Sequence, residues 1–309
     1  MAILIYPGNR DIHAWITALK SVDEELDIRV YPETGNPKEI TFGLTWPYPH
    51  GLWNDFPRLK ALSSIGAGVS HILDDETLDK NIPVLKLTDS RLNRSMWEYL
   101  LSTISYQTMQ LHRYQEQQSE KTWKEIPPRG FEHTTIGIFG LGNIGKYVAE
   151  RLTVLGFVVK GFANSPKEIA GVAVYTPSET TEEVMKDLDI VVSILPLTAK
   201  TAGMFNADFF GRLKPNTTFI NVGRGPQVIE EDLLAALESG QLSHAFLDVF
   251  DLEPLPTDHP FWPHPGISIT PHIASITDPI SVAPQIVANY HRAMEGLPLH
   301  NRIDRVLGY

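Results

Sequence analysis

The sequence contains no cysteine, and this absence removes several classes of chemistry. Without thiols the chain can form no disulfide, no thiolate nucleophile, no Cys-x-x-Cys redox pair and no zinc site built on sulfur. Any oxidation or reduction that the protein carries out must therefore use a bound cofactor. The missing thiols leave the redox compartment undetermined.

Positive charge is also scarce. The 309 residues include 26 Lys and Arg against 37 Asp and Glu, a formal net charge of −11, and the basic residues form no continuous block. A surface of this sign repels a phosphate backbone, so we expect no nucleic-acid partner.

Long apolar runs are absent as well. The most apolar interior stretch, residues 188–199, is well short of the roughly 20 residues needed to cross a bilayer, and it contains Asp189 and Pro196. The first residues have neither the basic start nor the apolar run of a signal peptide, and Pro7 and Gly8 end what we interpret as a first strand. We therefore expect no membrane partner and a cytoplasmic location.

What the sequence does contain is an alternation of short β-rich runs and helical segments, which is typical of parallel sheets flanked by helices. A helix is predicted over residues 12–22, and strands are predicted at residues 3–6, 28–31, 41–46 and 59–65. A long helix predicted over residues 93–118 is apolar around most of its circumference. We expect it to be buried on several sides, as a bridge between domains, in a subunit interface or in an ordinary core.

Residues 125–130 include two adjacent prolines and separate this part of the chain from a second βα series. Its strands are predicted at residues 136–139, 158–162, 190–195, 218–222, 245–249 and 267–270. Six strands with intervening helices form a doubly wound sheet of the Rossmann type. A last amphipathic helix, over residues 282–294, has no strand to join in this sheet, and we expect it to pack on the first domain.

The predicted fold is therefore α/β, with two doubly wound parallel sheets, and the length also suggests two domains. We expect a dinucleotide-binding domain over residues 97–276. It would be inserted into a flavodoxin-like substrate domain formed by residues 1–96 and 277–309.

The most specific local motif is Gly-x-Gly-x-x-Gly, directly after a predicted strand and at the start of a helix. Gly140 would permit the tight turn, Gly142 the close approach of a pyrophosphate, and Gly145 the packing of helix on strand. Backbone N–H groups at the helix N-terminus suit phosphate groups. The predicted cofactor-binding residues of this loop are Gly140, Leu141, Gly142, Asn143, Ile144 and Gly145.

The second strand of the second series is predicted at residues 158–162. Its end predicts which nicotinamide cofactor is used, because NAD enzymes place an Asp or Glu there for the ribose hydroxyls. Residues 161–167 contain no carboxylate, and Asn164, Ser165 and Lys167 could hydrogen-bond or neutralise a 2′-phosphate. We therefore predict a preference for NADP(H), with NAD(H) as the alternative. Arginine, the usual partner of that phosphate, is missing, and Lys167 is equally typical of a solvated surface.

Three further motifs each follow a predicted strand of the second series. In Asn-Val-Gly-Arg-Gly, residues 221–225, Arg224 lies at a strand's carboxyl end, where open α/β sheets bind ligands. Its guanidinium can fork onto a carboxylate and a carbonyl oxygen. The other two motifs are Asp-Val-Phe-Asp-Leu-Glu-Pro-Leu-Pro, residues 248–256, and Pro-His-Ile-Ala, residues 271–274.

With these motifs in this order, the chain resembles the D-2-hydroxyacid dehydrogenase family and, within it, is similar to the glyoxylate/hydroxypyruvate reductase A group. The shared motifs extend from about residue 64 to residue 277 and include His-Pro-Phe-Trp at residues 259–262. The resemblance implies an NADPH-preferring reductase that converts glyoxylate to glycolate or hydroxypyruvate to D-glycerate, with its active site between two α/β domains.

By this resemblance Arg224 binds the substrate carboxylate and carbonyl oxygen, His272 is the acid or base, and Glu253 orients His272. These residue types suit hydride transfer, because the carbonyl oxygen gains negative charge and needs a proton donor and a cation beside it. A carboxylate beside His272 also favours the imidazolium form of its ring.

Further contacts are expected from both domains. Residues at other strand ends of the second series are predicted to contact the cofactor: Leu195, Pro196, Val222, Gly223 and Asp248. The resemblance also implies that the first domain supplies substrate contacts from Trp46, Ala67, Gly68 and Val69. An aromatic residue that ends a strand is more often part of a core, and this core role stays open for Trp46 as an alternative.

Two other groups of residues are not interpreted as sites. His259 and His264 lie in a proline-rich segment before His272 and predict a packed aromatic loop, so we expect no metal. Residues 74–76, Asp-Asp-Glu, are interpreted as the acidic start of a helix.

Two alternatives remain. One is an NAD-dependent D-2-hydroxyacid dehydrogenase for another substrate such as D-lactate, and the other is a non-enzymatic, nucleotide-sensing protein similar to a corepressor. The expected partner is a small 2-oxo or 2-hydroxy acid, and the expected assembly is a homodimer.

Overall fold

The computed structural model describes residues 1–8, 12–66 and 68–305. The chain divides into two compact units, one formed by residues Met1–Leu92 and Ile276–Tyr309 and the other by residues Asn93–Ser275. Both divisions fall slightly earlier in the chain than the boundaries predicted after residues 96 and 276. Among the described residues, no helix is both long enough and apolar enough to span a bilayer.

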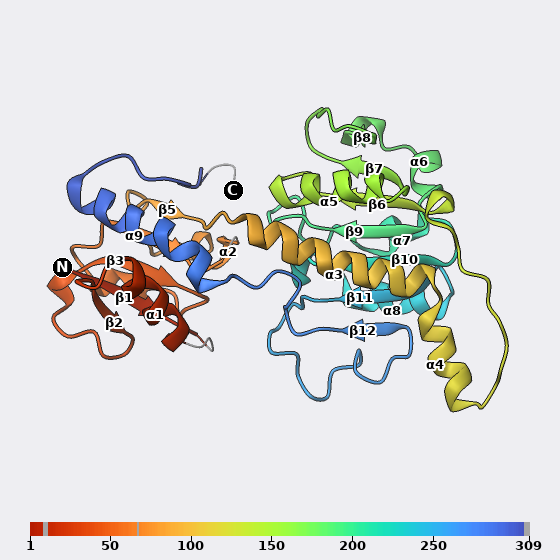
Figure 1. The fold of residues 1–309 in the computed structure, drawn as a ribbon, viewed down its shortest axis with the longest axis horizontal. Coiled ribbons are helices and arrows are strands. Elements are labelled where there is room, and N and C mark those ends of the chain that lie inside the picture. Colours follow the sequence, from red (N-terminus) through yellow and green to blue (C-terminus); the bar gives the residue numbers. More distant parts are fainter. Residues whose placement is uncertain (9–11, 67, 306–309) are drawn as a thin grey trace. The chain divides into compact units, whose positions relative to one another are not determined.

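The first unit is built on a five-stranded parallel sheet with the order β2-β1-β3-β4-β5, the doubly wound order of flavodoxin-like folds. This confirms the predicted fold class (Figure 1). Its strands are β1 (Ala2–Tyr6), β2 (Asp27–Val30), β3 (Ile40–Thr45), β4 (Ala61–Ser64) and β5 (Val84–Leu85). Its helices are α1 (Ile12–Val22), α2 (Ser70–Leu73) and α9 (Pro279–Glu295), with 3-10 turns η1 (Pro37–Glu39) and η2 (Leu52–Asp55).

Alternate residues of β1 point to opposite faces of this sheet, as the two-residue period of a strand requires. Ile3 and Ile5 belong to a core that includes side chains of α1 and α9, whereas Ala2 and Leu4 belong to a separate core. α9 packs against α1, and its Tyr290 hydroxyl donates to the Met1 carbonyl oxygen (2.9 Å). α9, late in the chain, therefore packs in the core on one face of the first sheet.

The second unit contains a seven-stranded parallel sheet with the order β12-β11-β10-β9-β6-β7-β8, a Rossmann-type order extended by one strand. Its strands are β6 (Thr135–Phe139), β7 (Val158–Phe162), β8 (Val172–Tyr175), β9 (Ile190–Ser193), β10 (Thr217–Asn221), β11 (Leu242–Leu247) and β12 (Ile267–Ile269). The remaining helices are α3 (Ser90–Thr108), α4 (Leu111–Ser119), α5 (Asn143–Val154), α6 (Glu182–Lys186), α7 (Ala207–Gly211) and α8 (Glu230–Glu238), with η3 (Phe131–His133), η4 (Pro177–Glu179) and η5 (Gly225–Gln227).

Two sequence predictions for this unit were wrong. The prediction of six strands missed β8, a four-residue edge strand paired with β7, because none of its residues is fully buried and its apolar pattern is weak. The helix predicted over residues 93–118 is broken into α3 and α4. Gln110 between them has a φ of 58°, and this left-handed conformation ends α3 without a glycine or proline to signal it.

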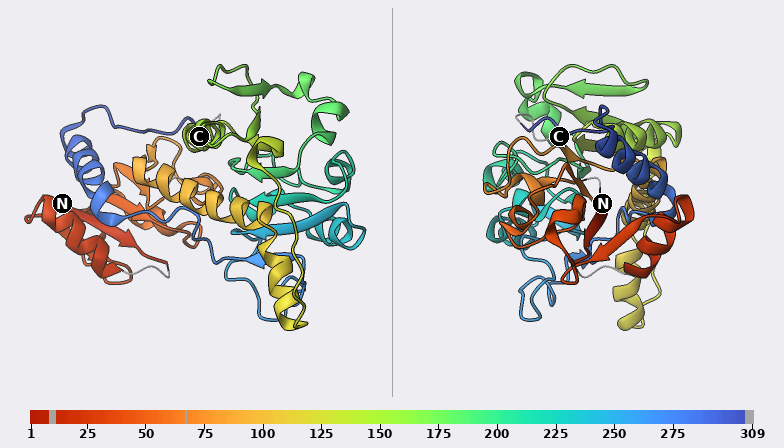
Figure 2. Two further views of the ribbon diagram at one scale, coloured as in Figure 1. Left: turned by 45° about the vertical axis from the view of Figure 1, so that its right-hand side comes forward. Right: turned by 90° about the vertical axis from the view of Figure 1, so that its left-hand side faces the viewer.

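In the single chain the second half of this helical region is not buried, so its burial on several sides would require the subunit interface that the prediction included. α3 buries Met96, Leu100 and Ile104 in the core of the second unit, but Met109 and Leu111 are exposed. Figures 1 and 2 show α4 extending away from the sheet of this unit. The apolar residues around the break therefore have a different role from those of the core.

The acidic residues 74–76 do not begin a helix, because α2 ends just before them at Leu73. Asp75 is instead buried and accepts hydrogen bonds from the Tyr48 hydroxyl (3.1 Å), the Gly51 N–H (3.1 Å) and the Thr77 N–H (3.0 Å). Asp75 therefore anchors a turn, a role that needs partners from distant parts of the sequence.

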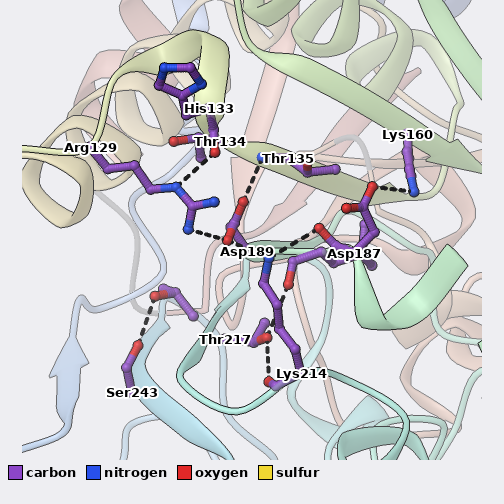
Figure 3. A network of polar contacts seen from close by, with 12 residues as sticks. Arg129, His133, Thr134, Thr135, Lys160, Asp187, Asp189, Lys214, Thr217 and Ser243 are labelled. Atoms are coloured by element: carbon purple, nitrogen blue, oxygen red, sulfur yellow. Dashed lines mark hydrogen bonds and ion pairs between the residues drawn. The ribbon is translucent and has the colours of Figure 1, made fainter. Parts of the chain in front are cut away.

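Polar contacts join the amino ends of the central strands in the second unit (Figure 3). The buried Asp189 carboxylate precedes β9, accepts from the Thr135 N–H of β6 (2.8 Å), and pairs with Arg129 and with Lys214 (2.6 Å). Thr217, at the start of β10, donates to the Lys214 carbonyl oxygen (2.8 Å). These contacts lie at the edge opposite the carboxyl ends, where sheets of this kind bind ligands.

Candidate active site

The glycine loop joins β6 to α5. Gly140 has a φ of 102°, and a β-carbon there would lie 2.9 Å from the Ile194 carbonyl oxygen; one on Gly145 would lie 1.9 Å from the Gly140 carbonyl oxygen. A β-carbon on Gly142, the N-cap of α5, would meet no described atom within 4 Å. The packing of the loop thus requires Gly140 and Gly145, while Gly142 leaves room over the backbone for a phosphate group, as a dinucleotide requires.

This loop lies at the point where the strand order of the sheet reverses. β6 is flanked by β7 on one side and by β9 on the other, and Ile194, which Gly140 approaches, follows β9. Doubly wound sheets bind their ligands at such a switch point. The residues predicted at other strand ends lie on the loops after β9 (Leu195 and Pro196) and β10 (Val222 and Gly223), on the same side of β6.

A pocket of about 370 Å³ opens beside the glycine loop. It is lined by Leu141, Gly142, Asn143, Lys146, Lys167, Glu168 and Ile169. The Lys167 ammonium donates to the Leu141 carbonyl oxygen (2.7 Å), which holds the positive charge against the loop. Asn164 and Ser165 are exposed in the loop after β7, and their contact with a cofactor remains a prediction.

Sequence reasoning missed Lys146 and Glu168 as residues of this pocket. Lys146 could have been found, because it directly follows the third glycine and so lies on the first turns of the helix that begins at the loop. Glu168 had no comparable signal, since an acidic residue in a loop is usually solvated. Only the fold places it across the pocket from α5.

Arg224 follows β10 and is held through its backbone. Asn221, at the end of β10, donates from Nδ2 to the Arg224 carbonyl oxygen (3.1 Å) and accepts from the Gly223 N–H (3.0 Å). The Arg224 N–H donates to Oε1 of Gln227 (3.1 Å). The guanidinium donates to the Gly223 carbonyl oxygen (2.6 Å), so both ends of the residue are restrained.

A second pair of residues lies on the loops that follow β11 and β12. Glu253 accepts the Phe250 N–H at Oε1 (3.0 Å), and its Oε2 lies 2.7 Å from Nδ1 of His272. A β-carbon on Gly225 would lie 1.8 Å from the Phe250 carbonyl carbon, so this glycine lets the Arg224 loop approach the Glu253 loop. Because Nδ1 of His272 faces Glu253, Nε2 is the nitrogen that would exchange a proton with a substrate.

Glu253 interacts electrostatically with both His272 and Arg224. Burial raises the pKa of Glu253. The hydrogen bond to His272, the charge of His272, the hydrogen bond from the Phe250 N–H and the charge of Arg224 lower it by a larger amount. The pKa of Glu253 therefore lies below its usual value. Burial lowers the pKa of the Arg224 guanidinium, and Glu253 partly offsets this. The site therefore combines a carboxylate, a histidine ring and an arginine cation, since arginine stays protonated in proteins.

His272 has a φ of 55°, a left-handed conformation that few non-glycine residues adopt. The buried Asp248, after β11, holds the segment in that conformation. Its Oδ1 accepts the Thr270 hydroxyl (2.6 Å) and the Ile273 N–H (2.8 Å), and its Oδ2 accepts the Ala274 N–H (2.9 Å). The Asp248 carbonyl oxygen accepts the His272 N–H (2.9 Å). The carboxylate thus supports the His272 loop, and its predicted contact with a cofactor remains a prediction.

The substrate contacts predicted in the first unit begin with Trp46, which directly follows β3 and is half-buried. Its ring lies 5.6 Å from the ring of His71, and a β-carbon on Gly66 would lie 2.8 Å from it. Gly68 and the buried Val69, the N-cap of α2, follow β4, whereas Ala67 lies outside the described residues. Contact between these residues and a substrate remains a prediction.

His259 and His264, the two histidines of the proline-rich segment, have structural partners within the fold. His259 pairs with Glu230 (3.1 Å between Nε2 and Oε2), its ring packs against Phe261 at 4.6 Å, and His264 accepts the Gly266 N–H at Nδ1 (3.1 Å). Within residues 1–8, 12–66 and 68–305, no three His, Asp or Glu side chains are grouped as they would be around a metal ion.

Comparison with known proteins agrees with this geometry. Residues 101–274 match the D-isomer specific 2-hydroxyacid dehydrogenase, NAD binding domain, family. The proteins named glyoxylate/hydroxypyruvate reductase A from Serratia proteamaculans and Yersinia enterocolitica are 37% and 36% identical to this chain, each over 100% of both sequences.

Solved structures show the same relationship. A D-isomer specific 2-hydroxyacid dehydrogenase from Xanthobacter autotrophicus in complex with NADPH and MES superposes with a TM-score of 0.93 at 35% identity, covering 100% of this chain and 99% of that one. An NADPH-dependent glyoxylate/hydroxypyruvate reductase from Sinorhizobium meliloti in complex with NADP and sulfate has a TM-score of 0.92 at 30% identity, covering 100% of both chains.

Proposed function

The chain belongs to the D-isomer specific 2-hydroxyacid dehydrogenase family, and from this premise we propose that it is an NADPH-preferring reductase of small 2-oxo acids, with glyoxylate and hydroxypyruvate as substrates. The observation that carries the proposal is the Glu253–His272 contact of 2.7 Å, electrostatically coupled to Arg224, on loops at the strand ends of a dinucleotide-binding sheet. The relatives that match over their full length bear the name of this activity.

The three side chains have distinct roles in this reaction. Bound NADPH supplies a hydride to the carbonyl carbon of the 2-oxo acid. Arg224 binds the substrate carboxylate and carbonyl oxygen, and its charge stabilises the negative charge that grows on that oxygen. His272 donates a proton from Nε2 to the same oxygen, while Glu253 orients the ring through Nδ1 and stabilises its imidazolium form.

The choice of NADPH over NADH is assigned to the pocket beside the glycine loop. Lys146 and Lys167 bring two positive charges to it and Glu168 one negative charge, so its net charge favours an anionic group. A 2′-phosphate carries the added negative charge that distinguishes NADPH from NADH. Because Glu168 opposes that charge, we expect a preference rather than strict exclusion of NADH.

Replacing Lys146 or Lys167 with alanine is expected to raise the KM for NADPH about tenfold and to leave the KM for NADH nearly unchanged, because a charge-assisted contact is lost. Glu168→Gln is expected to lower the KM for NADPH. Lys186→Ala, which removes a surface lysine paired with Glu182 on α6, is the matched control and should change neither KM. Equal effects of the pocket lysines on both cofactors would contradict the assignment.

The proposed activity is tested by following the absorbance of NADPH and NADH with glyoxylate, hydroxypyruvate and pyruvate. The proposal expects the highest kcat/KM with NADPH and glyoxylate or hydroxypyruvate. Faster reaction with NADH and pyruvate would instead favour a dehydrogenase of the D-lactate type. Nucleotide binding without oxidation of either cofactor by any of these acids would favour the corepressor-like alternative.

The proposed assembly is a homodimer formed through α4 and the segment after it. Leu111 and Tyr114 on α4, and Met109 just before it, are exposed, and Trp123 is fully exposed. Apolar side chains gathered on an extension of this kind are typical of an interaction surface. We place this dimer in the cytoplasm, with no nucleic-acid or membrane partner, and a monomeric mass in solution would contradict the assembly.

A further inference from the structure

The amide of Gln227, in the short turn η5 after Arg224, is completely buried and makes four hydrogen bonds. Its Oε1 accepts the Arg224 N–H (3.1 Å) and the Ser193 hydroxyl (3.2 Å). Its Nε2 donates to the carbonyl oxygens of Leu195 (3.1 Å) and Pro196 (3.0 Å). These contacts use both acceptor positions and both hydrogens of the amide, so its hydrogen-bonding capacity is fully used.

The four bonds join two loops that follow adjacent strands. Ser193 ends β9 and Leu195 follows it, whereas Arg224 follows β10. Gly223 permits the contact, because a β-carbon there would lie 2.6 Å from Oε1 of Gln227 and 2.8 Å from the Leu195 carbonyl oxygen. The two loops therefore approach each other around this amide, and the glycine leaves no side chain to separate them.

We propose that Gln227 is a positioning residue for the reduction. Its buried amide fixes the Arg224 backbone, from which the guanidinium reaches the substrate, relative to residues 195–196, which lie beside the cofactor. The inference rests on the proposed function, since it takes Arg224 as the substrate-binding residue. Hydride transfer requires the carbonyl carbon and the nicotinamide to be aligned within a fraction of an ångström, and one side chain that holds both loops sets that alignment.

An amide suits this position better than other side chains of similar size. Leucine fills the same space but offers neither a donor for the two carbonyl oxygens nor an acceptor for the Arg224 N–H and the Ser193 hydroxyl. A glutamate carboxylate accepts both but donates nothing, and it regains one donor only when it is protonated. Substitutions at this position therefore separate the donor contacts from the acceptor contacts.

The first test compares Gln227→Leu with Thr217→Val, a matched control that removes a buried hydroxyl at the opposite end of β10. Below the Tm of both variants, kcat/KM for glyoxylate with NADPH is expected to fall roughly 10²-fold in Gln227→Leu, mostly through a higher KM for glyoxylate. Thr217→Val is expected to lower the Tm and keep wild-type kcat/KM. Wild-type kcat/KM in Gln227→Leu would overturn the proposal.

Gln227→Glu provides a second readout that does not depend on the leucine variant folding. The ratio of its kcat/KM to that of the wild type is expected to rise as the pH falls, because protonation restores a donor to one of the two carbonyl oxygens. A purely structural role would change the Tm of this variant and leave the ratio independent of pH at temperatures where both proteins are folded. A flat ratio would therefore overturn the proposal.

Failure of the proposed function would be recognised separately. If the wild-type protein reduces no 2-oxo acid, the reaction is wrong, and the positioning role is then tested by the Kd for NADPH, measured by fluorescence titration. Because residues 195–196 lie on the cofactor side, Gln227→Leu is expected to raise this Kd about tenfold relative to Thr217→Val. Equal Kd values in the two variants would overturn the positioning role itself.

Discussion

Replacing His272 with glutamine is expected to lower kcat for the reduction of glyoxylate by roughly 10²- to 10⁴-fold, because the reaction loses its positioned proton donor. A glutamine side chain can still hydrogen-bond to Glu253, which now contacts Nδ1 at 2.7 Å, but it cannot give up a proton near neutral pH. Steady-state kinetics with NADPH measure the effect. The Kd for NADPH should change little, since His272 acts on the substrate oxygen.

His133→Gln is the matched control for this variant. His133 lies in η3 before β6, and its side chain is 74% exposed, so its replacement is expected to leave both kcat and Tm unchanged. The Tm of His272→Gln is expected to fall, because glutamine tolerates the left-handed backbone at this position less well than histidine. Turnover at the wild-type rate would show that His272 is not the acid.

Arg224→Gln is expected to lower kcat/KM for glyoxylate by about 10²-fold or more, mainly through a higher KM, because the substrate carboxylate loses its charged partner. The same change should not lower the Tm. Burial lowers the pKa of Arg224, which means that the folded protein disfavours the positive charge of the guanidinium. That charge is the one that the substrate carboxylate would contact. In the proposed role this arginine serves substrate binding at a cost in stability, and its removal is expected to relieve that cost.

The control for this prediction is Arg212→Gln, which should show the opposite pattern. Arg212 follows α7 and donates to the Thr180 carbonyl oxygen (2.8 Å), a contact within the second unit that involves none of the predicted site residues. Its loss is expected to lower the Tm and leave kcat/KM unchanged. Arg224→Lys is expected to fall between wild type and Arg224→Gln, because lysine keeps the charge but lacks the two-pronged geometry. If Arg224→Gln lost stability and kept its kcat/KM, Arg224 would be structural.

Several features could be predicted because their signals are local. The glycine loop carries its own turn, helix start and space for a phosphate in six consecutive residues, and parallel strands bring their carboxyl ends to one edge. Arg224, Glu253 and His272 each follow a predicted strand, and the family resemblance implies that the three act together. The structure then places Glu253 against His272, and the charges of Glu253 and Arg224 interact.

The features that sequence reasoning missed depend on contacts between distant segments. Nothing in the local pattern distinguishes Glu168 from a solvated loop residue or marks Gln110 as the end of a helix. The role of Asp248 in holding the His272 loop involves residues more than twenty positions away. Glutamine is usually a surface residue, and only the fold shows that Gln227 is completely buried.

The sequence by itself determined the α/β class, the two parallel sheets, the glycine loop and the candidate site residues, because strand periodicity, glycine geometry and side-chain chemistry are properties of short segments. Only the tertiary structure decided which groups hold those residues in place. It assigned Asp248 to the His272 loop, Gln227 to the Arg224 loop, and Lys146, Lys167 and Glu168 to one pocket. Buried polar groups must find hydrogen-bond partners wherever the fold brings them, and those partners cannot be read from neighbours along the chain.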